Sequence, residues 1–215
     1  MRVAIAGAHG QVAMLLHPLL GERGHEVRGL IRNPDHVDAV RAAGAEPVLC
    51  DLEAEADIAA AVGEVDAVVF AAGAGPGSGA ARKRTLDRDA ALKLIDAARR
   101  NGIHRYVMVS AMKPEQPRGD EVFRVYLQAR AEADAALRES GLDWTIVRPG
   151  RLTDEPGTGH VTIAPELERA DIARADVAAV LAEVLELPGT AGLQFEVVAG
   201  DTPIREALAA CPRMA

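Results

Sequence analysis

The chain begins with a short apolar segment that leads through a glycine turn into a second apolar segment. Residues 3–6 are Val-Ala-Ile-Ala, the turn holds Gly7 and Gly10, and the apolar residues of 12–20 follow at once. A buried strand, a glycine turn and a helix in this order place the amides of a helix N-terminus where a dinucleotide pyrophosphate binds. The alternative is a strand–helix turn without a ligand.

Strand-like and helix-like segments alternate along the rest of the chain. This alternation predicts a single α/β domain over 1–215, with a doubly wound parallel sheet of about seven strands and helices on both faces. A chain of 215 residues fits one domain, since splitting becomes common only beyond about 250–300 residues. The expected strands are 3–6, 27–31, 47–50, 67–72, 105–110, 144–148 and 194–198, and the expected helices are 11–22, 34–43, 54–62, 81–101, 120–140 and 175–187.

Three glycine- or proline-containing segments follow predicted strands. They lie near 74–86, 113–120 and 152–168. Ligands of open α/β sheets bind at the carboxyl ends of the strands. We therefore expect these three loops to shape the site of a small-molecule substrate.

Composition narrows the classes of partner. The formal net charge of −8 argues against a nucleic acid or an anionic membrane surface, which attract basic faces. The chain has no apolar run near the roughly 20 residues that span a bilayer. Cys50 and Cys211 stand far apart, and the six histidines show no ligand spacing, so we expect a cytoplasmic protein without a metal site. A monomer and a homodimer both remain open.

The end of the second expected strand bears on the cofactor. NAD-selective sites usually place an acidic residue about 20 residues beyond the glycines, on the ribose 2′-hydroxyl. Here that place holds Arg32 and no acid. A guanidinium binds phosphate with two parallel hydrogen bonds, so we expect NADP(H) rather than NAD(H), with Arg32 on the 2′-phosphate. The alternative is a surface arginine.

Other candidate cofactor residues each have a second interpretation. His9 faces either phosphate or solvent. Asp51 either accepts a bond from the adenine amino group or caps the following helix. The small residues Ala71, Ala72 and Gly73 either let the backbone approach the ribose or simply pack tightly. The full set of expected cofactor contacts is Gly7, His9, Gly10, Gln11, Val12, Arg32, Asp51, Leu52, Ala71, Ala72, Gly73, Ser110, Pro149, Gly150, Arg151 and Leu152.

The order and spacing of several motifs resemble the atypical short-chain dehydrogenase/reductases. These motifs are Gly7-Ala-His-Gly10, Asp51-Leu52, Phe70-Ala-Ala-Gly73, Val107-Met-Val-Ser110 and Thr145-Ile-Val-Arg148-Pro149-Gly150. The chain is similar to small NAD(P)H-binding members akin to biliverdin reductase B, a flavin reductase, and to the NmrA-like redox sensors. The resemblance implies a seven-stranded Rossmann sheet, an NADP cofactor and a Pro149-Gly150 turn beneath the nicotinamide.

The superfamily commonly uses a Tyr-x-x-x-Lys pair and a preceding serine. This chain has Tyr126-Leu-Gln-Ala-Arg130, and Ser110 ends the fifth expected strand. Residues four apart share a helix face, so Arg130 keeps a positive charge beside the phenol and is placed to bond the nicotinamide ribose. Tyr126, Arg130 and Ser110 are the catalytic candidates. Tyr126 also lies in an apolar helical stripe, so a core-edge role is the alternative.

Three functions follow from these residues. The first is an NADPH-dependent oxidoreductase that transfers hydride to a small carbonyl, quinone, flavin or related conjugated acceptor. The second is a non-enzymatic NADP(H)-binding redox sensor with a protein partner, suggested by the incomplete Ser–Tyr–Lys set. The third is an NADP-assisted epimerase or dehydratase, for which 215 residues leave little room for a separate substrate domain.

Overall fold

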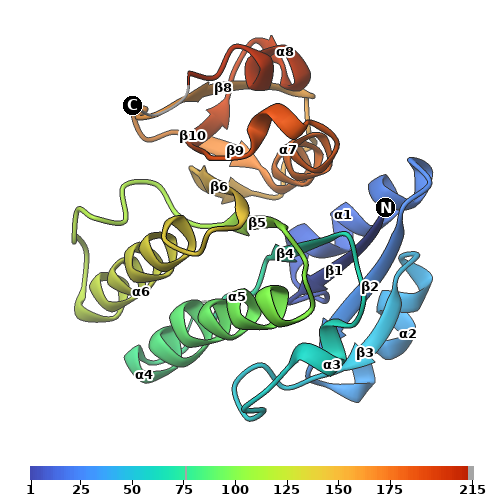
Figure 1. Ribbon diagram of the computed structural model, residues 1–215. Coiled ribbons are helices and arrows are strands. Elements are labelled where there is room, and N and C mark those ends of the chain that lie inside the picture. The colour runs from blue at the N-terminus through green and yellow to red at the C-terminus, as the bar shows by residue number, and fades with distance from the viewer. Residues whose placement is uncertain (76, 213–215) are drawn as a thin grey trace.

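The computed structural model has three layers, with a central sheet between two sets of helices (Figure 1). It describes residues 1–75 and 77–212, so residue 76 of the expected 74–86 loop and residues 213–215 of the expected domain lie outside the described residues. The strands are β1 (Arg2–Ala6), β2 (Glu26–Ile31), β3 (Glu46–Leu49), β4 (Ala67–Phe70), β5 (Arg105–Val109), β6 (Asp143–Pro149), β7 (Arg151–Thr153), β8 (His160–Ala164), β9 (Asp171–Ala173), β10 (Leu193–Ala199) and β11 (Thr202–Pro203).

The helices include several short segments. They are α1 (Gln11–Glu22), the 3₁₀ turn η1 (Pro34–His36), α2 (Val37–Ala42), α3 (Ala59–Val62), α4 (Ala80–Arg82), the π-helical η2 (Lys83–Asp89), α5 (Ala90–Arg100), α6 (Glu121–Arg138), α7 (Arg174–Glu186), the 3₁₀ turn η3 (Pro188–Thr190) and α8 (Ile204–Ala209).

Seven strands of the main sheet pair in parallel, and they are the seven that the sequence predicts; among the described residues, β7 and β9 form a separate parallel pair. Over the described ranges the main sheet nevertheless has nine strands, in the order β11-β8-β10-β6-β5-β4-β1-β2-β3. Strand β8 is antiparallel to both β10 and β11. The expectation of about seven strands is thus confirmed for the parallel part, and β8 and β11 extend it at one edge.

Alternate residues of each central strand enter different cores. Val3 and Ile5 of β1 pack on the side of α1, α7 and α8, whereas Ala4 and Ala6 pack on the side of α3, α5 and α6. Figure 1 shows α5 and α6 on one face of the sheet and α7 beyond the other. This two-sided burial explains why the strands are continuous apolar runs.

Three expected segments differ in the structure. The expected helix 54–62 is helical only in α3, because Lys93 Nζ binds the carbonyl oxygens of Leu52, Glu53 and Glu55 at 2.6–3.1 Å. The expected loop 74–86 is helical from residue 80 onward. The expected loop 152–168 contains the end of β7 and all of β8, and only 113–120 has no regular element before α6.

The chain reverses its direction across the sheet at β1. Strand β1 pairs with β2 on one side and with β4 on the other. The helices that follow β1 and β4, α1 and α5, therefore lie on opposite faces of the sheet. Such a reversal opens a crevice at the strand ends, where open α/β sheets bind ligands. The glycine turn begins at this crevice.

Candidate cofactor and acceptor site

One large pocket of about 1380 Å³ lies along the carboxyl ends of the parallel strands. The structure brings all of the predicted site residues to its wall. They are Gly7, His9, Gly10, Gln11, Val12, Arg32, Asp51, Leu52, Ala71, Ala72, Gly73, Ser110, Tyr126, Arg130, Pro149, Gly150, Arg151 and Leu152. A shared wall does not assign a contact to each, so the individual ligand contacts stay predictions.

The glycine turn has the shape of a phosphate cradle. Gly7 has φ +82°, and a Cβ there would lie 2.6 Å from the Ala72 Cα. Helix α1 begins after Gly10 with no capping side chain and no acidic residue in its first turn. The first amides of a helix have no partner within it, so those of 11–13 remain for an anion. These residues fit the pyrophosphate of a dinucleotide.

His9 leaves the turn toward the surface. It is exposed, and its ring stacks on His36 with centroids 3.5 Å apart. Partial burial and the neighbouring His36 lower the pKa of His9. The exposure of His9 agrees with the solvent-facing alternative, although His9 and His36 both line the pocket.

Arg32 belongs to a small charge cluster at one end of the pocket. Its Nη1 lies 3.1 Å from Glu53 Oε2, and Arg82 Nε lies 3.1 Å from the same oxygen. Thr85 donates its hydroxyl to Glu53 Oε1 at 2.7 Å. Two guanidiniums thus share one carboxylate, which leaves a net positive charge and unused donors.

Asp51 caps the chain that follows it. Its Oδ1 accepts from the backbone amides of Glu53 and Ala54 at 2.9 and 3.2 Å. Asp51 therefore caps a turn and not the expected helix, because α3 begins only at Ala59 and has no capping side chain. A bond from Asp51 to an adenine amino group stays a prediction.

Tyr126 lies where its helix passes from the core to the pocket. Ala129, Ala133 and Leu137 of the expected stripe are buried, Val122 is exposed, and Tyr126 is half-buried in the pocket wall. Lys83 Nζ lies 5.2 Å from the centre of its ring, and the Arg130 guanidinium lies 5.5 Å from it. Tyr126 is therefore a pocket residue held between two cations, and not only a core-edge aromatic.

Arg130 is fixed by the protein itself. Its Nη1 donates to the Val109 carbonyl at 2.8 Å, and its Nη2 donates to the Ala72 carbonyl at 2.9 Å and to Asp87 Oδ1 at 2.7 Å. Both side chains of the Arg130–Asp87 ion pair are buried. These contacts fix the charge of Arg130 in the pocket wall, and its bond to the nicotinamide ribose stays a prediction.

The hydroxyl of Ser110 also points into the protein. It donates to Asp134 Oδ2 at 2.9 Å, and Arg148 donates to the same oxygen through Nε at 3.0 Å and Nη2 at 2.8 Å. Burial raises the pKa of Asp134 against the opposing effect of Arg148. The proton of Ser110 is thus directed at Asp134 and not at the pocket, and the catalytic role of Ser110 stays a prediction.

The turn after β6 approaches the backbone of 170. A Cβ on Gly150 would lie 2.1 Å from the Ala170 carbonyl oxygen, so a side chain is excluded there. Arg151 donates its amide to the same carbonyl at 3.0 Å. Its Nε donates to Asp171 Oδ1 at 2.8 Å, so the Arg151 side chain is paired along the pocket rim.

Comparison with known proteins places this site in a family. Residues 7–188 match the model of the NAD(P)H-binding family. The uncharacterized sugar epimerase YhfK of Bacillus subtilis is 41% identical over 97% of this chain and 99% of its own length.

The chain belongs to the NAD(P)H-binding family. A solved Bacillus halodurans protein described as a proposed NAD-dependent epimerase/dehydratase is 42% identical, with a TM-score of 0.91 over 97% of this chain and 99% of that one. The oxidoreductase ylbE of Lactococcus lactis is 28% identical, with a TM-score of 0.86 over 98% and 96%. The family match confirms the expected NAD(P)H cofactor and the resemblance to atypical short-chain dehydrogenase/reductases.

Several residues that line the pocket of this NAD(P)H-binding protein were not predicted from the sequence. Glu53, Arg82 and Lys83 line the pocket but come from segments without a motif. Asp87 and Asp134 are buried partners of Arg130 and Arg148. The only available signal was their charge within otherwise apolar helical segments, because each pairing joins residues at least 14 positions apart.

In 1–75 and 77–212, no cluster of three or more histidine, cysteine or acidic side chains could hold a metal ion. No helix in these ranges has the length and apolar character that crossing a bilayer requires.

Proposed function

We propose that this protein is an NADPH-dependent oxidoreductase that reduces a small carbonyl, quinone, flavin or related conjugated acceptor. The observation that carries the proposal is the position of Tyr126. It shares one pocket with the glycine turn, and two cations lie over its ring. This arrangement supports proton donation beside a bound nicotinamide.

The residues present fit the cofactor at both of its phosphate positions. The amides of 11–13 suit the pyrophosphate, and the Arg32–Glu53–Arg82 cluster suits a 2′-phosphate, because two guanidiniums share a single carboxylate. A hydrogen bond to a charged group contributes about 1.5–3 kcal/mol. We therefore propose NADPH over NADH, although the Bacillus halodurans relative is described with NAD.

Bound NADPH supplies a hydride, which is a proton with two electrons. For a carbonyl acceptor, the carbon receives the hydride while the oxygen takes a proton. Tyr126 gives that proton as its O–H bond breaks, and the charges of Lys83 and Arg130 stabilise the phenolate that remains. Solvent then returns the proton to Tyr126. A flavin or quinone acceptor takes its proton directly from solvent.

The test is NADPH oxidation over a panel of aldehydes, quinones and flavins, together with direct NADPH binding. Turnover of any acceptor with NADPH preferred over NADH supports the proposal. Tight NADPH binding with no turnover overturns it in favour of a redox sensor. Absence of NADPH binding overturns both.

A second candidate is an epimerase or dehydratase. It is favoured by the descriptions of the two relatives at 41% and 42% identity. Such an enzyme oxidises and re-reduces its substrate, so the cofactor is regenerated in each cycle. Conversion of a nucleotide sugar without net NADPH consumption would identify it.

A further inference from the structure

The pocket carries more positive than negative charge, in a protein whose formal net charge is −8. Eight lysine and arginine residues line its described part, against four carboxylates. Most of these cations have a carboxylate partner: Arg32 and Arg82 share Glu53, Arg130 pairs with Asp87, Arg151 with Asp171 and Arg174 with Asp154. The three remaining cations of the described pocket wall, Lys83, Arg118 and Arg169, form no ion pair, and of these three Lys83 lies over Tyr126.

Arg118 is held in place by neutral groups. Its Nη1 donates to the carbonyls of Lys113 and Gln116 at 3.0 and 3.2 Å, and its Nη2 donates to the Met112 carbonyl at 3.0 Å. Its Nε is buried and has no partner in the described structure. Backbone carbonyls thus orient the guanidinium without cancelling its charge.

Aromatic contacts place Arg118 at the end of the pocket that holds Tyr126. The guanidinium lies 5.6 Å from the centre of the Phe123 ring, and that ring lies 5.7 Å from the Tyr126 ring. The Arg32 cluster marks the other end, after β2. The charge of Arg118 therefore faces the space beside the proposed proton donor, away from the cofactor's 2′-phosphate position.

Arg169 is a second cation near the first. It is exposed at the pocket rim. Burial lowers the pKa of Arg118, and the charge of Arg169 lowers it further, while Glu196 opposes the change. Two like charges on the wall of one pocket repel each other unless an anion lies between them, and paired guanidiniums are suited to carboxylates and phosphates.

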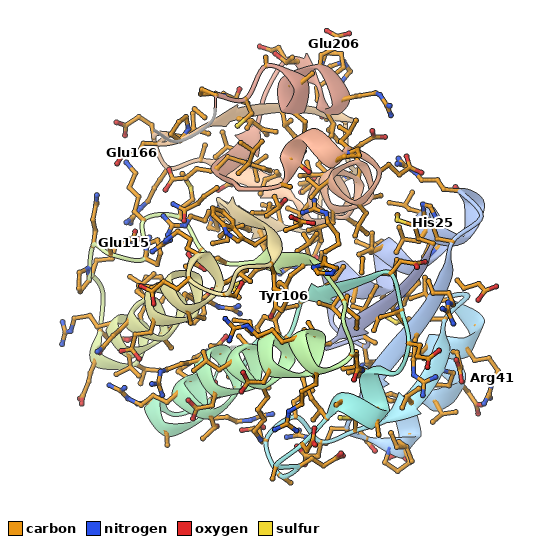
Figure 2. All side chains as sticks on the ribbon, in the orientation of Figure 1. His25, Arg41, Tyr106, Glu115, Glu166 and Glu206 are labelled. Carbon is orange, nitrogen blue, oxygen red and sulfur yellow. The ribbon has the colours of Figure 1, made fainter. Side chains whose placement is uncertain are left out.

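A buried carboxylate joins the two loops that carry these arginines. Glu196 on β10 is 1% exposed. Its Oε1 accepts from the Lys113 amide and its Oε2 from the Leu167 amide, both at 2.8 Å. Figure 2 shows Glu115 and Glu166, one from each loop, at the same edge of the molecule. Glu196 thus connects the loop that carries Arg118 to the loop that carries Arg169.

We propose that Arg118 and Arg169 bind the carboxylate or phosphate group of a flat conjugated acceptor, whose apolar body lies against Phe123. This inference deepens the proposed reductase function and rests on it. It adds that the acceptor is anionic, and it makes Glu196 a positioning residue that never touches the ligand.

The test compares FMN with riboflavin, which share one conjugated ring system and differ by one phosphate. Each is titrated into NADP⁺-saturated protein, and binding is followed by quenching of flavin fluorescence. We expect FMN to bind about tenfold more tightly than riboflavin, the factor that corresponds to one charge-assisted contact. Arg169→Gln should bring the two affinities together by weakening FMN alone.

The matched control is Arg41→Gln, which removes the same charge from α2, at the far side of the molecule from both loops (Figure 2). Arg41→Gln should leave the ratio of the FMN affinity to the riboflavin affinity unchanged. Equal binding of the two flavins, binding of neither, or an unchanged ratio in Arg169→Gln overturns the proposal. NADP⁺ binding is measured separately by calorimetry. Its absence would contradict the proposed function, and the flavin titration on the free protein would still decide the anion site.

Discussion

Lys83 Nζ lies 5.2 Å from the centre of the Tyr126 ring, although the two residues come from different helices, η2 and α6. In the Tyr-x-x-x-Lys pair of the superfamily that the sequence resembles, the cation follows the tyrosine by four residues on the same helix. Here that position holds Arg130, which is tied to Asp87. The pocket therefore has two cations at its phenol, one fixed in the wall and one free of ion pairs in the described structure.

Replacement of Tyr126 tests its role as proton donor. We expect Tyr126→Phe to lower kcat with an aldehyde acceptor by about 10²- to 10⁴-fold, the usual contribution of a positioned acid. Turnover of a quinone or flavin should change little, because solvent supplies the proton. The matched control is Tyr106→Phe, which alters a buried phenol whose hydroxyl donates to the Ala91 carbonyl at 3.3 Å. Equal aldehyde rates in Tyr126→Phe and the wild type would contradict the role.

Lys83 offers a second test at the same ring. Burial lowers the pKa of Lys83, and the charges of Arg130 and Arg82 add to this effect against Asp87. A cation over an aromatic ring contributes about 1 kcal/mol, so Lys83→Met should lower the aldehyde kcat roughly fivefold. Lys83→Arg should restore most of it. If steady-state kinetics show Lys83→Arg to be as slow as Lys83→Met, the charge is not what matters.

The Arg32–Glu53 pair should control the choice of nicotinamide cofactor. Arg32→Ala removes a donor to the 2′-phosphate, so we expect the NADPH Kd to rise about tenfold or more, with the NADH Kd nearly unchanged. Glu53→Gln removes the competing carboxylate and should tighten NADPH binding. Both constants can be measured by nicotinamide fluorescence. A similar loss of NADH affinity in Arg32→Ala would place Arg32 elsewhere on the cofactor.

The buried Arg130–Asp87 pair should matter for stability. Arg130→Met leaves the carboxylate of Asp87, which is 0% exposed, without its partner. Loss of one member of a buried pair costs about 3–5 kcal/mol in the free energy of unfolding. The control is Arg88→Met, which breaks partly exposed ion pairs with Asp89 and Glu132 and should lower the free energy of unfolding by less, about 1 kcal/mol per pair at most. Urea unfolding measures both, and equal losses would argue against a structural role for the pair.

His17 predicts a pH dependence of stability. Its Nε2 lies 2.7 Å from the Ala8 carbonyl, so this nitrogen carries the proton, and Nδ1 is buried without a partner in the described structure. Burial lowers the pKa of His17 below its ordinary 6.5. As the pH falls through 6.5, His17 becomes protonated in the unfolded chain but stays neutral in the folded protein. The free energy of unfolding therefore decreases, by at most about 1.4 kcal/mol per pH unit.

The measurement is urea unfolding between pH 7 and pH 5. In His17→Leu the slope with pH should flatten, although the lost bond to Ala8 lowers stability at every pH. His104→Gln changes an exposed histidine and should keep the wild-type slope. Parallel slopes in all three proteins would exclude His17 as the cause.

Most of the parallel strands were predictable because burial on both faces favours apolar residues along a strand. Strand β8 was not predictable, since it lies next to the edge of the sheet, between β10 and the two-residue β11. In it His160 and Thr162 are exposed and only Val161 is fully buried. Its pairing with β10 depends on a partner more than 30 residues away. The late start of the expected helix 54–62, at Ala59, likewise depends on Lys93, whose contact no local pattern reveals.

The amino-acid sequence by itself determined the nucleotide turn, the parallel sheet and the strand-end residues of the pocket wall, because these depend on local spacing and on strand ends that meet at one edge. Only the tertiary structure decided which polar groups face the ligand. Ser110 donates to Asp134 and Arg130 pairs with Asp87, while Lys83 and Arg118 keep their charge for the pocket. Buried charges require partners, and these partners are brought together by packing rather than by order along the chain.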